Sequence, residues 1–153
     1  EMCIRDRAYT SLGTYDFHEM LALVDQLSRT TGVPIPELVR SFGHHLLGRF
    51  AASFPHMFDA MPNTFAFLSR IEDYIHIEVR KLYPDAQLPS FTYEYPSDNQ
   101  LIMTYVSTRP FAMLADGLIA GAADHYGEAI DIQMEDLSDG AGTSARFVLT
   151  LQS

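Results

Sequence analysis

The chain has 153 residues, which is enough for one domain with a substantial core and too few for two comfortable ones. Hydrophobic residues make up 47% and charged residues 20%, as in ordinary globular proteins rather than disordered ones. The formal net charge of -10 argues against binding to nucleic acid or to an anionic membrane surface. No run reaches the roughly 18 apolar residues of a membrane span, and no signal peptide is recognisable, so we expect a cytoplasmic protein.

The first seven residues, EMCIRDR, differ in character from those that follow. We expect residues 1–7 to be adapter-derived sequence and residues 8–153 to be the domain; the alternative is a genuine N-terminus. The only cysteine, Cys3, belongs to this segment. Without it the chain has no disulfide, no thiolate ligand and no cysteine-based zinc site.

Two helices are predicted near the start of the chain. Residues 16–31 carry apolar residues at helical spacing, with Asp16 and Glu19 as a possible capping pair and Gly32 as the stop. Residues 36–54 repeat the pattern, with a proline in the first turn and another after the last.

A third helix is predicted over residues 63–83, running without interruption to Pro84. Apolar residues recur along one face of it. This apolar stripe consists of Leu68, Ile71, Ile75, Val79 and Leu82.

The second half of the chain predicts two hairpins around one helix. Residues 91–95 (FTYEY) and 100–107 (QLIMTYVS) alternate about an SDN turn, and residues 110–126 return to helical spacing. Residues 128–135 (EAIDIQME) and 145–151 (ARFVLTL) form the second hairpin. The fold class is therefore α+β, with N-terminal helices and a four-stranded antiparallel sheet packed with a helix.

No enzyme motif is complete in this sequence. His18 and Glu19 begin a zinc-protease pattern, but Ala22 stands where the second histidine is required. The chain also lacks a Walker loop, a GxGxxG loop and a strained nucleophile elbow. We therefore expect a protein that is not an enzyme.

The segment YVSTR places three polar side chains on one face of a strand. Side chains alternate along a strand, so Tyr105, Ser107 and Arg109 are expected to point the same way. A phenol, a hydroxyl and a guanidinium in a row suit one or two carboxylates, because arginine binds them bidentately. An ordinary solvated strand face would show the same pattern.

A single histidine, His76, lies within the third predicted helix. At 100° per residue it falls on the shoulder of the apolar stripe, where most histidines are half-buried surface residues. A shoulder is also where a helix presents a ligand to a pocket beside the core, and histidine is a common ligand of heme iron.

Together these features resemble the heme–nitric oxide/oxygen binding (H-NOX) domain, the sensor module related to the heme domain of soluble guanylate cyclase. The resemblance rests on a helical histidine, Pro89 in the following loop and the Y-x-S-x-R strand, in that order and spacing. It covers most of the chain from about Tyr15 onward, including GVPIPELVRSFGHHLLGRF, IHIEVRKLYPDAQLPSF and LIMTYVSTRPFAMLADGLIAGAADHYGE.

The resemblance implies that His76 ligates the iron of heme b (iron protoporphyrin IX) on its proximal side. Tyr105, Ser107 and Arg109 would bind the two propionates of the heme. Pro89 would press on the porphyrin and distort it. The sheet and the last helix would back the proximal face, and the N-terminal helices would form the distal face, where gas binds.

The choice of gas follows from the polarity of the distal side. Bound dioxygen is stabilised by a hydrogen-bond donor, whereas nitric oxide bonds strongly to ferrous iron without one. Family members that hold dioxygen place a tyrosine five residues after the arginine of the motif, where this chain has Leu114. The matching helical position, polar in such members, corresponds to Leu46. Both are apolar, so the resemblance implies a nitric oxide sensor that rejects dioxygen.

By the same resemblance, nitric oxide binding weakens the bond between iron and His76, and the resulting relaxation changes a partner surface. The expected partner is a histidine kinase or a diguanylate cyclase acting in trans. About three family helices are expected upstream of residue 8, so this truncated domain is expected to hold heme poorly. Two alternatives stay open: a heme-free interaction module of the same fold, and a redox-responsive heme sensor or carrier.

Overall fold

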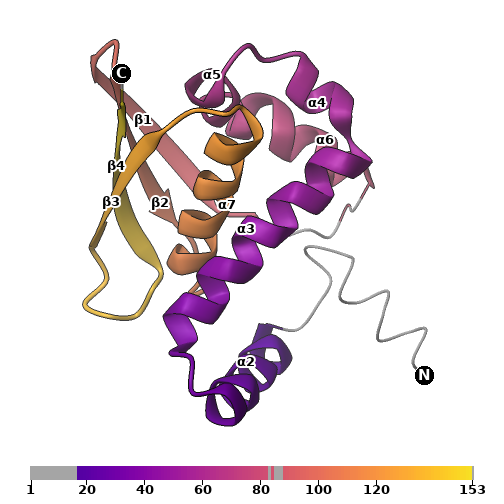
Figure 1. Ribbon diagram of the computed structural model, residues 1–153, viewed down its shortest axis with the longest axis vertical. Coiled ribbons are helices and arrows are strands. Elements are labelled where there is room, and N and C mark those ends of the chain that lie inside the picture. Colours follow the sequence, from indigo (N-terminus) through magenta and orange to yellow (C-terminus); the bar gives the residue numbers. More distant parts are fainter. Residues whose placement is uncertain (1–16, 83, 85–87, 153) are drawn as a thin grey trace.

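The computed structural model describes residues 17–82, 84 and 88–152 (Figure 1). It combines N-terminal helices with a four-stranded antiparallel sheet packed against a helix, as the sequence predicts. None of the helices in the described part of the chain combines the length and hydropathy of a membrane span. The expected capping residue Asp16 and the segment 1–7 lie outside the described residues.

The first two predicted helices are confirmed. Helix α2 (Phe17–Thr31) ends at Gly32, whose φ of 78° is favourable for glycine and whose N–H donates to the Ser28 carbonyl at 2.8 Å. Helix α3 (Ile35–Ser53) follows after a short turn. A further short helix that the sequence did not predict, α4 (Pro55–Asp59), begins at the proline that ends α3.

The third predicted helix is wrong as a continuous element. It begins where expected, since the Asn63 side chain caps it by accepting a hydrogen bond from the Ala66 N–H at 2.9 Å. The segment then divides into α5 (Thr64–Leu68), a π-helical turn η1 (Ile71–Ile75) and α6 (His76–Leu82). A π turn forms hydrogen bonds over five residues instead of four, and an apolar repeat does not reveal it.

The π turn changes which face of the helix His76 occupies. The His76 N–H donates to the carbonyl of Ile71, so the two residues stand one above the other. In an uninterrupted α-helix they would be about 140° apart around the axis. His76 is therefore buried, at 7% exposed, and not on a half-buried shoulder. Leu82, the expected end of the apolar stripe, is exposed instead.

Both predicted hairpins are confirmed and form one sheet. Its strands are β1 (Ser90–Ser97), β2 (Gln100–Val106), β3 (Ile130–Asp136) and β4 (Ser144–Leu151). The order β1-β2-β4-β3 puts β2 and β4 in the centre, and every neighbouring pair is antiparallel.

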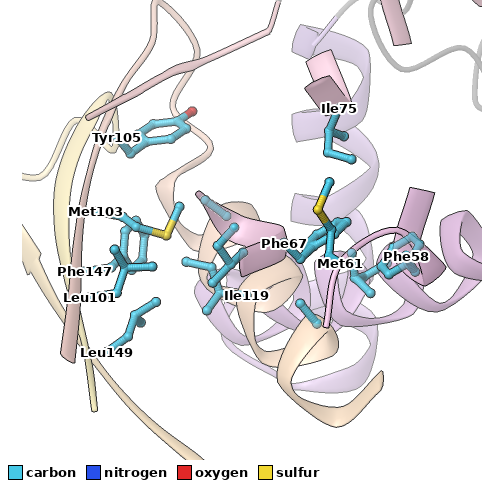
Figure 2. Packing of buried hydrophobic residues seen from close by; sticks show 14 of the residues in the cluster. Phe58, Met61, Phe67, Ile75, Leu101, Met103, Tyr105, Ile119, Phe147 and Leu149 are labelled. Carbon is cyan, nitrogen blue, oxygen red and sulfur yellow. The ribbon is translucent and has the colours of Figure 1, made fainter. Parts of the chain in front are cut away.

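Helix α7 (Ala112–His125) lies between the sheet and α3 (Figure 1). Alternate residues of the central strands face α7, and Met103 pairs directly with Phe147. Figure 2 shows these sheet residues on one side of Ile119 and an aromatic and aliphatic group from α4, α5 and η1 on the other. The core is thus continuous from the sheet to the helices that precede it.

Helices α3 and α7 approach closely because glycine lies where they cross. A Cβ at Gly117 would stand 1.9 Å from the Arg40 carbonyl oxygen, and one at Gly43 would stand 2.4 Å from the Leu114 carbonyl oxygen. Beside this contact, Arg40 Nε donates to Oδ1 of the buried Asp116 at 2.7 Å. The close approach at the two glycines fixes the distance between α3 and α7. Both helices line the cavity described next.

Candidate functional site

A cavity of about 210 Å³ lies between α3, η1, α6, the first hairpin and α7. Most of its walls are apolar side chains. It brings together the seven residues that the resemblance assigns to the heme site, which come from five separate segments of the chain. These residues are Leu46, His76, Pro89, Tyr105, Ser107, Arg109 and Leu114.

His76 presents an uncharged imidazole to this cavity. Burial lowers its pKa, and the nearby carboxylate of Glu72 opposes this only in part, so the ring is neutral at pH 7. Its Nδ1 lies 3.1 Å from Glu72 Oε1. Because an ionised carboxylate only accepts hydrogen bonds, this contact favours the tautomer with the proton on Nδ1 and leaves Nε2 as the nitrogen for a metal.

The three residues of the YxSxR motif meet through a turn and not along one strand. Strand β2 ends at Val106, and Pro110, which has no N–H, interrupts extended pairing beyond it. The Tyr105 hydroxyl donates to the Arg109 carbonyl at 3.2 Å, and the Arg109 N–H donates to Ser107 Oγ at 3.0 Å. The predicted strand row is thus wrong in its geometry, although all three residues do line the cavity.

Burial also keeps the Tyr105 phenol protonated. It raises the pKa of this group, and the neighbouring Ser107 hydroxyl reduces that rise only in part. The turn therefore places a protonated phenol, a serine hydroxyl and the guanidinium of Arg109 at the cavity wall. Such a set suits an anionic oxygen group.

The predicted apolar positions lie on separate walls of the same cavity. Leu46 comes from α3 and Leu114 from α7, and both are half-buried. Pro89 lies in the segment before β1, next to Leu88. A ligand here would meet hydrocarbon from α3, from α7 and from this segment.

Sequence reasoning missed several residues of the site. Glu72 was assigned no role, although its spacing of four residues from His76 is the one that joins side chains across a helical turn. Phe91 stands with its ring centroid 6.3 Å from that of the imidazole. Phe50 and Phe67 complete the aromatic part of the wall. The spacing of these aromatic residues in the sequence gave no indication of a ligand site.

Comparison with protein families gave a match over residues 1–134 to HNOB, described as haem-NO-binding. The curated proteins gave no match. Among solved structures, the chain is similar to the unliganded Fe(II) H-NOX protein of K. algicida, with 34% identity and a TM-score of 0.86 over 92% of this chain and 76% of that one.

Two further structures give the same result. The IWP-051-bound H-NOX of Shewanella woodyi in the Fe(II)CO state is 40% identical, with a TM-score of 0.77 over 92% of this chain and 74% of that one. The H-NOX protein of S. oneidensis in the Fe(II)NO state is 27% identical, with a TM-score of 0.86 over 94% and 79%. This family comprises heme-containing, gas-binding sensor domains that are typically non-catalytic. The chain belongs to the haem-NO-binding, or H-NOX, family.

Proposed function

We propose that this chain binds heme b in the cavity and senses nitric oxide. The observation that carries the proposal is a buried His76, with Nδ1 3.1 Å from Glu72 Oε1, on the wall of a largely apolar cavity. Heme bound there would supply an iron that can bind a gas. His76 would hold that iron through Nε2, and the YxSxR turn would hold the propionates.

The donor set fits such a group. Across residues 17–82, 84 and 88–152, no three His, Cys, Asp or Glu side chains gather to hold a metal ion, so His76 would supply the single protein ligand. Apolar walls suit a porphyrin face, and Pro89 is placed to contact one. The volume of about 210 Å³ is below the roughly 300–1,000 Å³ of typical ligand sites, so entry requires side chains on facing walls to move apart.

The decisive experiment loads the purified chain with heme and compares it with His76→Ala. We expect the wild-type chain to give a five-coordinate ferrous spectrum that changes on addition of nitric oxide. His76→Ala is expected to lose the proximal-histidine signature and to regain it with added imidazole. His45→Ala, an exposed histidine on α3, is the matched control. An unchanged ferrous spectrum in His76→Ala would show that another residue holds the iron.

The apolar residues Leu46 and Leu114 support the proposal of nitric oxide over dioxygen. We expect Leu114→Tyr to raise dioxygen affinity by about 10- to 100-fold, because a hydrogen bond to a charged group contributes roughly 1.5–3 kcal/mol. Leu114→Phe adds the same ring without a hydroxyl and is expected to leave dioxygen binding negligible. Ferrous spectra in air would test this. Stable dioxygen binding by the wild-type chain would contradict nitric oxide selectivity.

The proposed output is a change in affinity for a separate signalling protein, a histidine kinase or a diguanylate cyclase. Helix α6 carries His76 on its buried side and Ile77 and Leu82 on its exposed side. Movement of His76 would therefore move an apolar outer surface. Nearly complete switching requires a difference of about 5 kcal/mol in partner affinity between the two states.

A further inference from the structure

We infer that Glu72 is a positioning residue that sets the strength of the bond between His76 and the iron. This inference rests on the proposed function, since it requires His76 to be the ligand. Glu72 lies in the turn before α6, outside the cavity lining, and its Oε1 lies 3.1 Å from His76 Nδ1. The imidazole is almost fully enclosed, whereas the carboxylate side chain is 41% exposed.

The π turn places Glu72, and not the adjacent Asp73, beside His76. The N–H groups of Ile75 and His76 each donate to a carbonyl five residues earlier, which sets the faces of the turn. Glu72 then shares a face with His76. The adjacent carboxylate, Asp73, is directed to Arg70, with Oδ1 2.9 Å from Nε. Of two consecutive acidic residues, only one therefore meets the imidazole.

The hydrogen bond has two consequences for a ligand at Nε2. A carboxylate that accepts from Nδ1–H fixes the tautomer and the orientation of the ring, and it makes the other nitrogen a stronger electron donor. With Nε2 as the stronger donor, His76 would hold the iron more firmly and would be released less readily when a gas binds. Glu72 thus sets how readily His76 dissociates from the iron. Because the carboxylate is partly exposed, its effect belongs at the lower end of the 10- to 100-fold range known for such partners.

The first test uses the heme-free chain and ¹⁵N-histidine NMR. We expect the wild-type spectrum to show His76 with its proton on Nδ1. Glu72→Gln is expected to weaken this preference, and Glu72→Ala to abolish it. Asp73→Asn removes the same charge one residue away and is the matched control, expected to leave His76 unchanged.

The second test uses the heme-loaded chain. Resonance Raman spectra are expected to show a lower iron–histidine stretching frequency in Glu72→Gln and a still lower one in Glu72→Ala. Transfer of heme to an acceptor protein is expected to become about 10-fold faster in Glu72→Ala. A larger fraction of the protein should release His76 when nitric oxide is added. Asp73→Asn should match the wild-type chain in all three measurements.

The outcomes separate this inference from the function on which it rests. Equal shifts in Glu72→Gln and Asp73→Asn would mean that only surface charge acts, and the inference would be wrong. The inference would also be wrong if Glu72→Ala left both the NMR and Raman signals unchanged while His76→Ala lost the proximal-histidine signature. If His76→Ala keeps the wild-type ferrous spectrum, the proposed function fails and this inference fails with it.

Discussion

A Gly117→Ala variant is expected to unfold at a lower temperature than the wild-type chain, by about 10 °C for a cost of about 3 kcal/mol at this chain length. The added methyl group would stand 1.9 Å from the Arg40 carbonyl oxygen and 3.0 Å from the backbone nitrogen of His44. Backbone atoms cannot rotate away as a side chain can, so α3 and α7 must separate. Separation also disturbs the buried Asp116 and its bond with Arg40. Thermal unfolding followed by circular dichroism measures the effect.

The control for this variant is Gly48→Ala on the same helix α3. No heavy atom lies within 4 Å of a Cβ at Gly48. Because alanine favours helix over glycine by roughly 0.5–1 kcal/mol, Gly48→Ala is expected to raise the unfolding temperature slightly. If both variants behaved alike, the close contact between α3 and α7 would be wrong.

The same contact sets the width of the proposed heme site. Helix α3 contributes Leu46 and Phe50 to the cavity, and α7 contributes Leu114 and Leu118. The glycines at the crossing determine how far apart these walls stand. Gly117→Ala should therefore release heme faster than Gly48→Ala does, in addition to being less stable.

Much of the fold could be predicted because its signals are local. The two hairpins follow from alternation around turn residues, α2 ends at Gly32, and α5 begins at Asn63. The residues of the site are far apart in the sequence, so local signals predict the site less well than the fold. His76 and the YxSxR motif are ordinary patterns taken singly, and only the resemblance to a known family joined them. The structure then brings them onto one cavity.

The remaining features depend on contacts that a local pattern does not encode. The π turn before His76 interrupts an apolar repeat that would fit a straight helix. Arg40 meets Asp116 across 76 residues of sequence. The chain leaves the extended conformation after Val106, so alternation along the strand did not apply to Arg109. Each of these departures lies at the site or at the helix contact that shapes it.

A Phe58→Ala variant is expected to lose about 3–5 kcal/mol of stability, a large share of what a domain of this size possesses. Phe58 is 1% exposed, and its ring stacks on that of Phe67 with centroids 4.4 Å apart. Phe50 meets the ring edge-on at 5.9 Å. Urea unfolding of the heme-free and heme-loaded chains would measure the loss. Because Phe50 and Phe67 both line the cavity, removal of the ring also leaves a void directly behind the cavity wall.

Phe42→Ala is the matched control, since the Phe42 residue on α3 is 39% exposed and its loss is expected to cost less than about 1 kcal/mol. Phe58→Leu refills part of the void, so its loss of stability should lie between those of Phe58→Ala and Phe42→Ala. Heme retention should be highest in Phe42→Ala, intermediate in Phe58→Leu and lowest in Phe58→Ala, because a less well packed cavity wall holds a planar ligand less firmly. Equal stability of Phe58→Ala and Phe42→Ala would contradict the buried aromatic stack. Faster heme loss in Phe58→Ala, with His76 unchanged, would show that the cavity depends on this stack as well as on the iron ligand.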